Sequence, residues 1–513
     1  MALILLIFLI VVSSEQASSF STGLQESRSI AIPSDQVLHE SITIDSDSDF
    51  IAQGWPGNGS ISNPYLIEGL AIMSDDDCVK ISNTSSYFVI RNCSFSWMLD
   101  HHGTGVYLRN VTHGTIELST MSGLGVGIYD RHSTENVFRN NTIEDAWNGI
   151  AIESCNNNVV SNNTVTGNRR ADDIHISISR NCLVLGNFVR GISLTWSINC
   201  TVGHNSGLIE GLNIFGENLT HWLHQIHDNY FNGTILGYFR DTSDSIIDGT
   251  LYSQLILVNV TRAMISGGVF QNLSMGVQII DSADCIVSDF VSKNNFRVGV
   301  NIENSYNCTI VNGSIAEHLI GVSVSSSERT GIKGTQMNNN SFSGIEVLSS
   351  NSCHFIENTI SNGRSGVSIY MSNNCTLSEN DIFGNDVGVE LWSSNYTLIT
   401  NNIVHENEIG ILLSSTTSHN LIYWNSFISN TDKNAVDDGI FNVWDDGISR
   451  GNIWSDYQGP GPYIIPGEAQ SIDRFPNVPV FQIPYEMIPV LFIIIIALVL
   501  IYSQKDRFHT PQG

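Results

Sequence analysis

Basic residues are scarce in this chain, which has 22 Lys and Arg against 50 Asp and Glu and a formal net charge of −28 at pH 7. Nucleic acids bind surfaces rich in Lys and Arg, so we expect no nucleic-acid partner. None of the nine cysteines has Cys-x-x-Cys spacing, which excludes the common zinc and redox motifs. The central part of the chain also lacks the apolar spacing of a long helix, and an all-β protein is therefore predicted.

A glycine followed by an aliphatic residue recurs along the chain at intervals of 22 or 23 residues. Fixed periods of this size are typical of solenoids, in which each unit stacks on the one before it. Within a unit, apolar and polar residues alternate, as around Val367 and Ile369, which indicates short strands. The glycines form two blocks, the first with Gly105, Gly127 and Gly149 and the second with Gly276, Gly299, Gly321, Gly344, Gly366, Gly388 and Gly410.

Clusters of Ser, Asn and Gly separate the strands and are expected to form turns, because Asn and Gly tolerate positive φ. Three short strands and three turns fit one unit, which makes each unit one coil of a single-stranded parallel β-helix. At a rise of roughly 4.8 Å per coil, about 16 coils over residues 80–435 would form a rod of about 75 Å. Asparagine pairs such as Asn140–Asn141, Asn162–Asn163 and Asn401–Asn402 predict ladders of side-chain amides along the rod.

Five cysteines each follow a coil glycine by nine residues, and we expect them to share one column of the rod: Cys200, Cys285, Cys308, Cys353 and Cys375. Cysteine is small and apolar enough to fill a tight inner turn. Adjacent coils would also bring two of them within disulfide range. We favour free, buried thiols, because regular stacking alone already satisfies the geometry.

The two ends of the chain differ from the repeats. Residues 2–12 are apolar and precede small residues, which is typical of a secretory signal peptide, although the lack of a preceding Lys or Arg leaves an uncleaved anchor open. Residues 483–502 are long and apolar enough for a transmembrane helix, and Lys505 and Arg507 indicate that the tail is cytoplasmic. We therefore expect a single-pass protein of the cell membrane with its rod outside the cell. Frequent Asn-x-Ser/Thr sequons agree with an exported glycoprotein.

The chain is accordingly divided into six segments. They are a signal peptide (1–17), a lead and N-terminal cap (18–79), the β-helix (80–435), a C-terminal cap and Pro-rich linker (436–482), the transmembrane helix (483–502) and a cytoplasmic tail (503–513). Between residues 200 and 260 the glycine spacing slips and aromatic residues gather. These irregular coils are where a rod would carry a specific feature.

Three kinds of motif point to a family: Gly-Ile/Val coils with Asn-Cys-Thr-Leu turns, the opening Trp55-Pro-Gly-Asn-Gly-Ser60 and the closing Gly451-Asn-Ile-Trp-Ser-Asp-Tyr457. Together they resemble NosD-type right-handed parallel β-helix proteins, as found on archaeal cell surfaces. The resemblance covers most of residues 40–475 and implies the right-handed winding, which the spacing alone does not show. NosD itself is associated with copper delivery in the periplasm, and the repeats do not carry that role over to this chain.

Three histidines within seven residues, His221, His224 and His227, form the sharpest candidate metal site and could hold Cu or Zn. On a strand, however, His224 would face away from the other two. No pattern of further ligands completes the site, although Asp228 is adjacent.

The segment Asp45-Ser-Asp-Ser-Asp49 begins like a calcium-binding loop. Phe50 and Pro56 then occupy the positions that an EF-hand gives to Gly and Glu, so that interpretation fails. We expect no cofactor, and bound Cu or Ca remains the alternative.

Hydrolases and lyases built on β-helices need carboxylates that converge across neighbouring coils. The candidates are Asp172 and Asp173, beside Arg169 and Arg170, and Asp432 in the decaying end of the repeat. No further catalytic motif accompanies them, so an enzyme is not the preferred interpretation.

The sequence therefore favours a membrane-anchored, extracellular and non-catalytic module that binds glycan or a cell-envelope protein along one face of the rod. The alternatives are a polysaccharide lyase or hydrolase, and a copper-handling accessory of the NosD kind.

Overall fold

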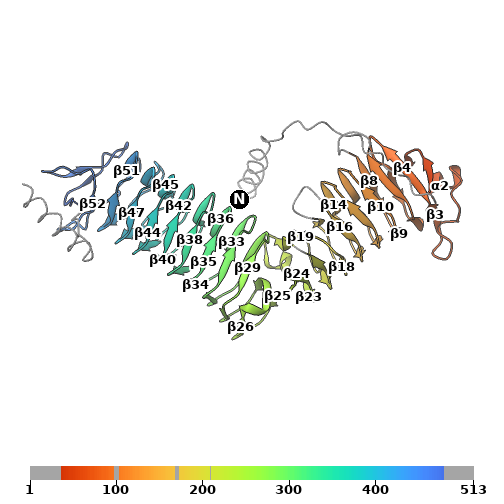
Figure 1. Cartoon of the computed structure of the whole chain (residues 1–513), viewed down its shortest axis with the longest axis horizontal. Coiled ribbons are helices and arrows are strands. Elements are labelled where there is room, and N and C mark those ends of the chain that lie inside the picture. The colour runs from red at the N-terminus through yellow and green to blue at the C-terminus, as the bar shows by residue number, and fades with distance from the viewer. Residues whose placement is uncertain (1–35, 98–102, 168–172, 208, 479–513) are drawn as a thin grey trace, which may run out of the picture.

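The computed structural model describes residues 36–97, 103–167, 173–207 and 209–478. Figure 1 shows these residues as two arms that meet in a V. Each arm is a parallel β-helix with three sheets, and together the arms make about 16 turns, which confirms the predicted solenoid. The predicted signal peptide, transmembrane helix and cytoplasmic tail lie outside the described residues. Within the described part of the chain, no helix combines the length and the apolar character that crossing a bilayer requires.

The N-terminal arm has three sheets, of which one carries the coil glycines. That sheet consists of β2 (Ile42–Ile44), β5 (Val79–Thr84), β8 (Thr104–Val111), β11 (Val126–Arg131), β14 (Asn148–Glu153), β17 (Ile174–Ser177), β19 (Gly191–Thr195) and β22 (Gly211–Phe215). The second sheet consists of β1 (Val37–His39), β4 (Leu70–Ser74), β7 (Ser94–Trp97), β10 (Thr120–Ser122), β13 (Thr142–Glu144) and β16 (Thr164–Thr166). The third sheet consists of β3 (Tyr65–Glu68), β6 (Phe88–Arg91), β9 (Gly114–Glu117), β12 (Val137–Arg139), β15 (Val159–Ser161), β18 (Leu183–Leu185), β20 (Thr201–Gly203) and β23 (Gln225–His227).

The C-terminal arm repeats this plan. Its glycine-bearing sheet consists of β21 (Ser206–Gly207), β24 (Tyr230–Phe231), β25 (Thr234–Arg240), β27 (Tyr252–Val258), β30 (Met275–Ile280), β33 (Val298–Glu303), β36 (Ile320–Ser325), β39 (Ser343–Leu348), β42 (Ser365–Tyr370), β45 (Val387–Trp392), β48 (Ile409–Leu413) and β51 (Lys433–Asp437). The second sheet consists of β29 (Val269–Gln271), β32 (Val291–Lys293), β35 (Ser314–Ala316), β38 (Gln336–Asn338), β41 (Thr359–Ser361), β44 (Asp381–Phe383), β47 (Ile403–His405), β50 (Ser426–Ile428) and β52 (Ile453–Trp454). The third sheet consists of β26 (Ile246–Asp248), β28 (Met264–Ser266), β31 (Ile286–Ser288), β34 (Thr309–Val311), β37 (Gly331–Lys333), β40 (His354–Ile356), β43 (Thr376–Ser378), β46 (Leu398–Thr400) and β49 (Leu421–Tyr423).

The recurring glycines are explained by the close approach of neighbouring coils. A Cβ atom added to Gly366 would lie 2.5 Å from the carbonyl oxygen of Gly388, and one added to Gly388 would lie 2.5 Å from that of Gly410. Real Cβ atoms do not come this close to backbone oxygen. The same contact recurs between successive coil glycines in both arms, from Gly105 to Gly127 and from Gly276 to Gly410, so these coils need a residue without a side chain at this point.

The asparagine pairs divide into two roles, and the predicted ladder is confirmed. The first member, such as Asn401, has a φ of 57° and makes the turn. The second member is buried, and its amide donates to the next coil: Asn380 Nδ2 to Asn402 Oδ1 at 2.8 Å, and Asn402 Nδ2 to Asn425 Oδ1 at 2.9 Å. These ladders satisfy turn groups that burial would otherwise leave unpaired.

All nine cysteines are free and buried, as predicted. They do not share a single column, because Cys200 belongs to the N-terminal arm, whereas the other four of the predicted set belong to the C-terminal arm. Burial in the apolar tube disfavours the charged thiolate, which raises the pKa of Cys78 to about 12. The Cys78 thiol therefore fills space inside the tube as a small apolar group.

The predicted irregular segment 200–260 is the junction of the arms. Strands β21 and β24 stack on the second sheet of the N-terminal arm. Strand β24 then pairs antiparallel with β25, and from β25 onward the same strands form the glycine-bearing sheet of the C-terminal arm. The buried Gln254 side chain fastens the junction. Its Oε1 accepts from Leu212 N at 3.0 Å, while its Nε2 donates to the carbonyl oxygens of Leu212 at 2.9 Å and Met275 at 3.0 Å.

Both ends of the tube are closed by aromatic residues. At the start, helix α2 (Asp47–Ala52) buries Phe50 against Tyr65, with ring centroids 4.6 Å apart. Strands β1 to β4 already pair with the next coil, so the solenoid begins at residue 37, inside the segment that the sequence assigned to the cap. At the other end, Trp444 and Trp454 are buried, and the hairpin of β53 (Tyr463–Ile464) and β54 (Ile472–Asp473) covers them together with Phe427.

The short 3₁₀ helices η1 (Leu219–His221) and η2 (Gly249–Leu251) both belong to the junction.

Candidate functional site

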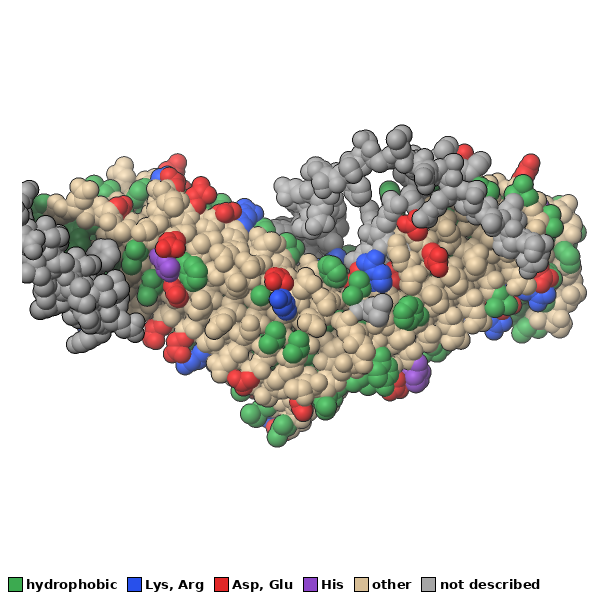
Figure 2. Space-filling model, viewed as in Figure 1, with side chains coloured by type: hydrophobic (Ala, Val, Ile, Leu, Met, Phe, Trp, Pro, Cys, Tyr) green, Lys and Arg blue, Asp and Glu red, His purple; other side chains and the backbone are tan. Residues whose placement is uncertain are grey.

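The two glycine-bearing sheets line the concave side of the V (Figure 1). We call their outward surface the concave face. It continues across the junction, where the Arg297 guanidinium lies 5.3 Å from the ring centroid of Phe215 at the end of β22. Because the coils are in register, side chains of neighbouring coils form columns along this face. Figure 2 shows that charged side chains on the visible side of both arms are few and scattered.

A hollow of about 340 Å³ opens on the concave face of the N-terminal arm. In one outward column, Tyr129 pairs with Ala151, and Ala151 pairs with His175. The small alanine forms a floor between an aromatic ring and an imidazole two coils apart. At roughly 4.8 Å per coil, the two walls stand about 10 Å apart, which is wide enough for a sugar ring.

Polar contacts hold the Tyr129 side chain beside this hollow. The Tyr129 hydroxyl donates a short hydrogen bond to Glu153, whose other oxygen lies 3.4 Å from the Arg131 guanidinium. Burial, together with this hydrogen bond, raises the pKa of Tyr129 to about 12. The phenol therefore stays protonated at neutral pH and cannot act as a base, while its ring and the Glu153 carboxylate remain available to hydroxyl groups.

A second cluster of aromatic and polar side chains lies on the concave face of the C-terminal arm, around Tyr370, Glu390 and Trp392. We call this cluster and the hollow beside Tyr129 the two stations of the concave face. The rings of Tyr370 and Trp392 stack with centroids 6.4 Å apart and an interplanar angle of 12°. The buried carboxylate of Glu390 accepts hydrogen bonds from Ser365 Oγ at 2.6 Å and Ser368 Oγ at 2.7 Å, and also from Tyr370 Oη and Trp392 Nε1. The glutamate thus holds the two rings in place.

Glu346 lies two coils from Glu390 in the same column, with Ser368 between them. Burial and the charge of Glu390 raise the pKa of Glu346 to about 7. A glycosidase needs two carboxyl groups that can exchange protons or attack the sugar. Both oxygens of Glu390 are occupied by donors, so only Glu346 is left for such a role.

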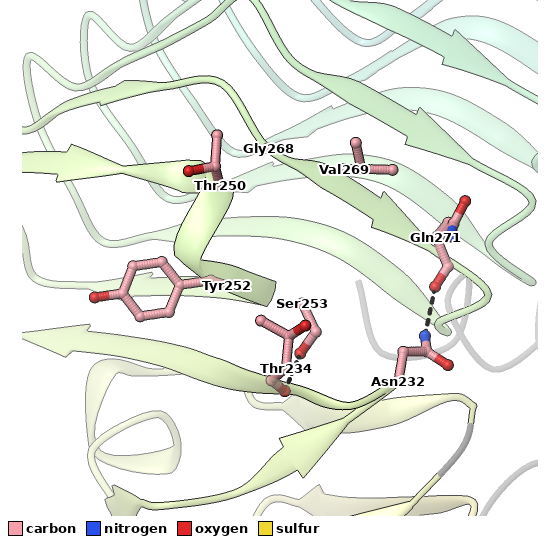
Figure 3. Close-up of a pocket in the computed structure, with 8 residues that line it drawn as sticks. All are labelled: Asn232, Thr234, Thr250, Tyr252, Ser253, Gly268, Val269 and Gln271. Carbon is pink, nitrogen blue, oxygen red and sulfur yellow. Dashed lines mark hydrogen bonds between the residues drawn. The ribbon is translucent and has the colours of Figure 1, made fainter.

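A second hollow, of about 250 Å³, lies at the junction (Figure 3). Within it, Asn232 Nδ2 donates to the carbonyl oxygen of Gln271 at 2.8 Å, and Ser253 Oγ donates to that of Thr234 at 3.0 Å. It is lined by Asn232, Thr234, Thr250, Tyr252, Ser253, Gly268, Val269 and Gln271. This lining contains no Asp, Glu, His, Lys or Arg.

The predicted catalytic aspartates do not converge among the residues that the structure describes. Asp172 lies outside them. Asp173 is buried, and its Oδ2 accepts from Arg190 N at 2.6 Å. Asp432 is exposed beside Lys433, at 3.8 Å. Neighbouring Asp437 is buried and binds main-chain and side-chain donors of the C-terminal cap, which is a structural role.

The predicted metal ligands are also separated by the fold. His224 is buried, where its Nδ1 accepts from Cys200 N at 3.1 Å and its Nε2 bonds the carbonyl oxygen of His221 at 2.9 Å. His221 Nδ1 accepts from Glu217 N at 3.2 Å. Only His227 belongs to a group of possible ligands found in the described residues.

The acidic segment at residues 45–49 forms a helix start. Asp49 Oδ2 accepts from Asp45 N at 2.8 Å and Ser46 N at 2.9 Å, which is a capping box for α2. Asp47 accepts from Ser86 N at 3.2 Å. These hydrogen bonds give Asp47 and Asp49 structural roles at the start of the helix.

The geometry defines the class of protein. A family profile described as "Right handed beta helix region" matches residues 77–229, and the chain is a right-handed parallel β-helix protein. A second profile, "Periplasmic copper-binding protein (NosD)", matches residues 265–459. The two matches and the parallel solenoid make the chain a NosD-type parallel β-helix protein, as its motifs indicated. No curated protein matches the sequence.

Solved structures with similar folds include the periplasmic alginate epimerase AlgG, with 12% identity, 86% of this chain and 84% of that chain covered, and a TM-score of 0.36. The surface adhesin PfbA of Streptococcus pneumoniae has 11% identity, coverage of 66% and 84%, and a TM-score of 0.21. An alginate lyase from Paenibacillus sp. FPU-7 has 13% identity, coverage of 62% and 94%, and a TM-score of 0.23. Scores this low carry no argument about function.

Proposed function

We propose that this protein is a non-catalytic surface module that binds neutral, hydroxyl-rich polysaccharide along its concave face. The observation that carries the proposal is the pairing of aromatic rings with fixed carboxylates at two stations of one continuous face. Sugars bind through the stacking of their CH-rich faces on aromatic rings and through hydroxyl donors to carboxylate oxygens. Tyr129 with Glu153 supplies both kinds of contact, and Tyr370 and Trp392, held in place by Glu390, supply the stacking surface.

The charge of the chain supports a neutral ligand. With a net charge of −28, the protein repels polyanions at long range. The second station adds Glu346 to Glu390, which disfavours uronate carboxylates further. A repeating polymer also suits a face whose own contacts repeat from coil to coil.

Placement outside the cell is part of the same proposal. Six sequon asparagines share one feature, since all of them are exposed and have positive φ: Asn110, Asn140, Asn199, Asn259, Asn307 and Asn374. Exposed turns are where N-linked glycans attach. An anchor formed by residues 483–502 would hold the V at the cell surface.

The test is isothermal titration of the full-length chain with oligosaccharides of a neutral glucan and, separately, of a polyuronate. We expect binding of the glucan, and we expect Tyr129→Ala and Trp392→Ala each to weaken it about tenfold, the value of one lost aromatic stack. Phe188→Ala is the matched control, because Phe188 is an exposed aromatic residue next to the second sheet, away from the concave face.

Three outcomes contradict the proposal. Tighter binding of the polyuronate would mean that charge governs recognition. An equal loss with Phe188→Ala would mean that the concave face is not the site. Release of new reducing or unsaturated sugar ends, abolished by Glu346→Gln, would make the protein an enzyme.

A further inference from the structure

A histidine pair and an aspartate meet at the end of the N-terminal arm. His227 is the last residue of β23, Asp228 follows it, and His204 follows β20 in the coil below. One ligand atom from each of the three lies within 4.8 Å of the others, and all three residues are exposed. Asp228 Oδ2 is 3.1 Å from His227 Nδ1 and 3.8 Å from His204 Nδ1.

We propose that His204, His227 and Asp228 bind a divalent d-block cation of the zinc type. Two imidazole nitrogens and one carboxylate oxygen are a common ligand set for Zn²⁺, whose tetrahedral shell is completed by water. Calcium and magnesium prefer shells made of oxygen, so a site with two imidazoles selects against them.

The register of the coils explains why these three side chains meet. Gly203 of β20 pairs directly with His227 of β23. A Cβ atom on Gly203 would lie 2.7 Å from His227 Cε1 and 3.0 Å from its Nε2, so the imidazole uses the space that the glycine leaves. His204 and Asp228, at φ values of 55° and 52°, take the same turn position in adjacent coils. The two imidazole rings are 5.1 Å apart between centroids.

The position in the fold suggests what the cation does. Strand β23 is the last strand of its sheet, so the coil that contains it is held from one side only. A cation shared between His204 of one coil and His227 of the next would cross-link the last two coils beside the junction. This inference is independent of polysaccharide binding, because the third sheet lies on the convex side of the V (Figure 1).

Other histidine–carboxylate pairs in the structure provide a control. His113 Nδ1 lies 3.3 Å from Glu135, and His405 Nε2 lies 3.0 Å from Asp381, in each case across adjacent coils. Neither pair belongs to a group of three possible ligands among the described residues. If a single imidazole and a carboxylate were sufficient, these pairs would bind the cation equally well.

The experiment is titration of the full-length, EDTA-treated chain with Zn²⁺, followed by calorimetry and by the visible spectrum of the Co²⁺-loaded protein. We expect one site per chain with the absorption of tetrahedral Co²⁺. His204→Ala and Asp228→Asn should each lower the affinity at least tenfold, whereas His113→Ala should leave it unchanged. Gly203→Ala should also lower it, because this substitution displaces His227 without removing a ligand.

Hydrogen exchange supplies a readout of the proposed cross-link. Zn²⁺ should slow exchange of the amides of Gln225–His227 in the unmodified chain. It should not slow their exchange in Asp228→Asn, where the asparagine side chain has nearly the same shape as the aspartate but lacks its charge. The proposal is overturned if Zn²⁺ binds no more tightly to the unmodified chain than to Asp228→Asn, or if His113→Ala loses as much affinity as His204→Ala. Circular dichroism of each variant identifies any change that comes from misfolding.

Discussion

Replacing one coil glycine by alanine tests the steric origin of the 22-residue repeat. In Gly366→Ala the new methyl carbon would lie 2.5 Å from the carbonyl oxygen of Gly388 and 2.6 Å from Ile382 Cγ2. The oxygen belongs to the backbone of β45, which is bonded on both sides within the sheet, so it cannot move away alone. Overpacking of a rigid site costs about 1–3 kcal/mol, and we expect the upper end of that range.

Gly331→Ala is the matched control. Neither glycine has positive φ, but at Gly331 the nearest atom to an added Cβ is Thr309 Cγ2, the end of a side chain, at 3.2 Å. This variant should stay within about 1 kcal/mol of the unmodified protein, because alanine also lowers the entropy of the unfolded chain. The assay is equilibrium urea unfolding, with hydrogen exchange of β42 and β45 added because a solenoid can unfold in parts. Equal stability of the two variants would refute the steric explanation.

The other structural predictions concern polar groups inside the tube. Asn380→Ala removes two hydrogen bonds donated by Asn358 and the two that Asn380 Nδ2 donates to Phe355 O and Asn402 Oδ1, so it should cost about 3 kcal/mol in urea unfolding. Asn373→Ala, in a ladder that is only half-buried, should cost less than half as much, and equal losses would contradict a role for burial. Burial raises the pKa of Asp130 from 3.8 to about 6, so the folded state binds this proton more tightly and stability falls as the pH rises through that interval. Between pH 4 and pH 6, the free energy of unfolding of the unmodified protein should fall by about 3 kcal/mol more than that of Asp130→Asn. Urea midpoints with the same pH dependence in both proteins would disprove this role of Asp130.

Much of the fold could be predicted because its causes are local. The glycines near 22-residue spacing, the Asn pairs and the alternating aliphatic residues each act within one coil or between two adjacent coils. The junction could not be predicted in the same way. The antiparallel pairing of β24 with β25 and the placement of Gln254 depend on contacts between segments that carry no repeat, so the sequence indicated only that the regular coils stop there.

The start of the solenoid shows a related difficulty. The segment 37–79 lacks the glycine spacing of the later coils, and was therefore assigned to the cap. In the structure it forms a full coil, because β2 and β3 pair in register with β5 and β6 even though helix α2 interrupts them. Backbone pairing between coils survives an insertion at a turn, whereas the insertion changes the number of residues per coil and so removes the regular spacing from the sequence.

The candidate sites show which spacing matters in a solenoid. His221, His224 and His227 are close in sequence, yet the chain turns between them and directs the first two into local hydrogen bonds. His204 and His227 are 23 residues apart, one repeat period, and their rings come within 5.1 Å.

The aromatic stations follow the same rule, since Tyr370 and Trp392 are separated by 22 residues and stack on adjacent coils. In a parallel β-helix, a residue's nearest outward neighbours lie one period away along the chain, because register pairs each coil with the next. A search for ligands one period apart, combined with the glycine pattern, would have found both His204 with His227 and Tyr370 with Trp392 from the sequence alone. Such a search would have missed Ala151. A small side chain between two large ones leaves a hollow, and only the structure shows that the space above Ala151 is empty.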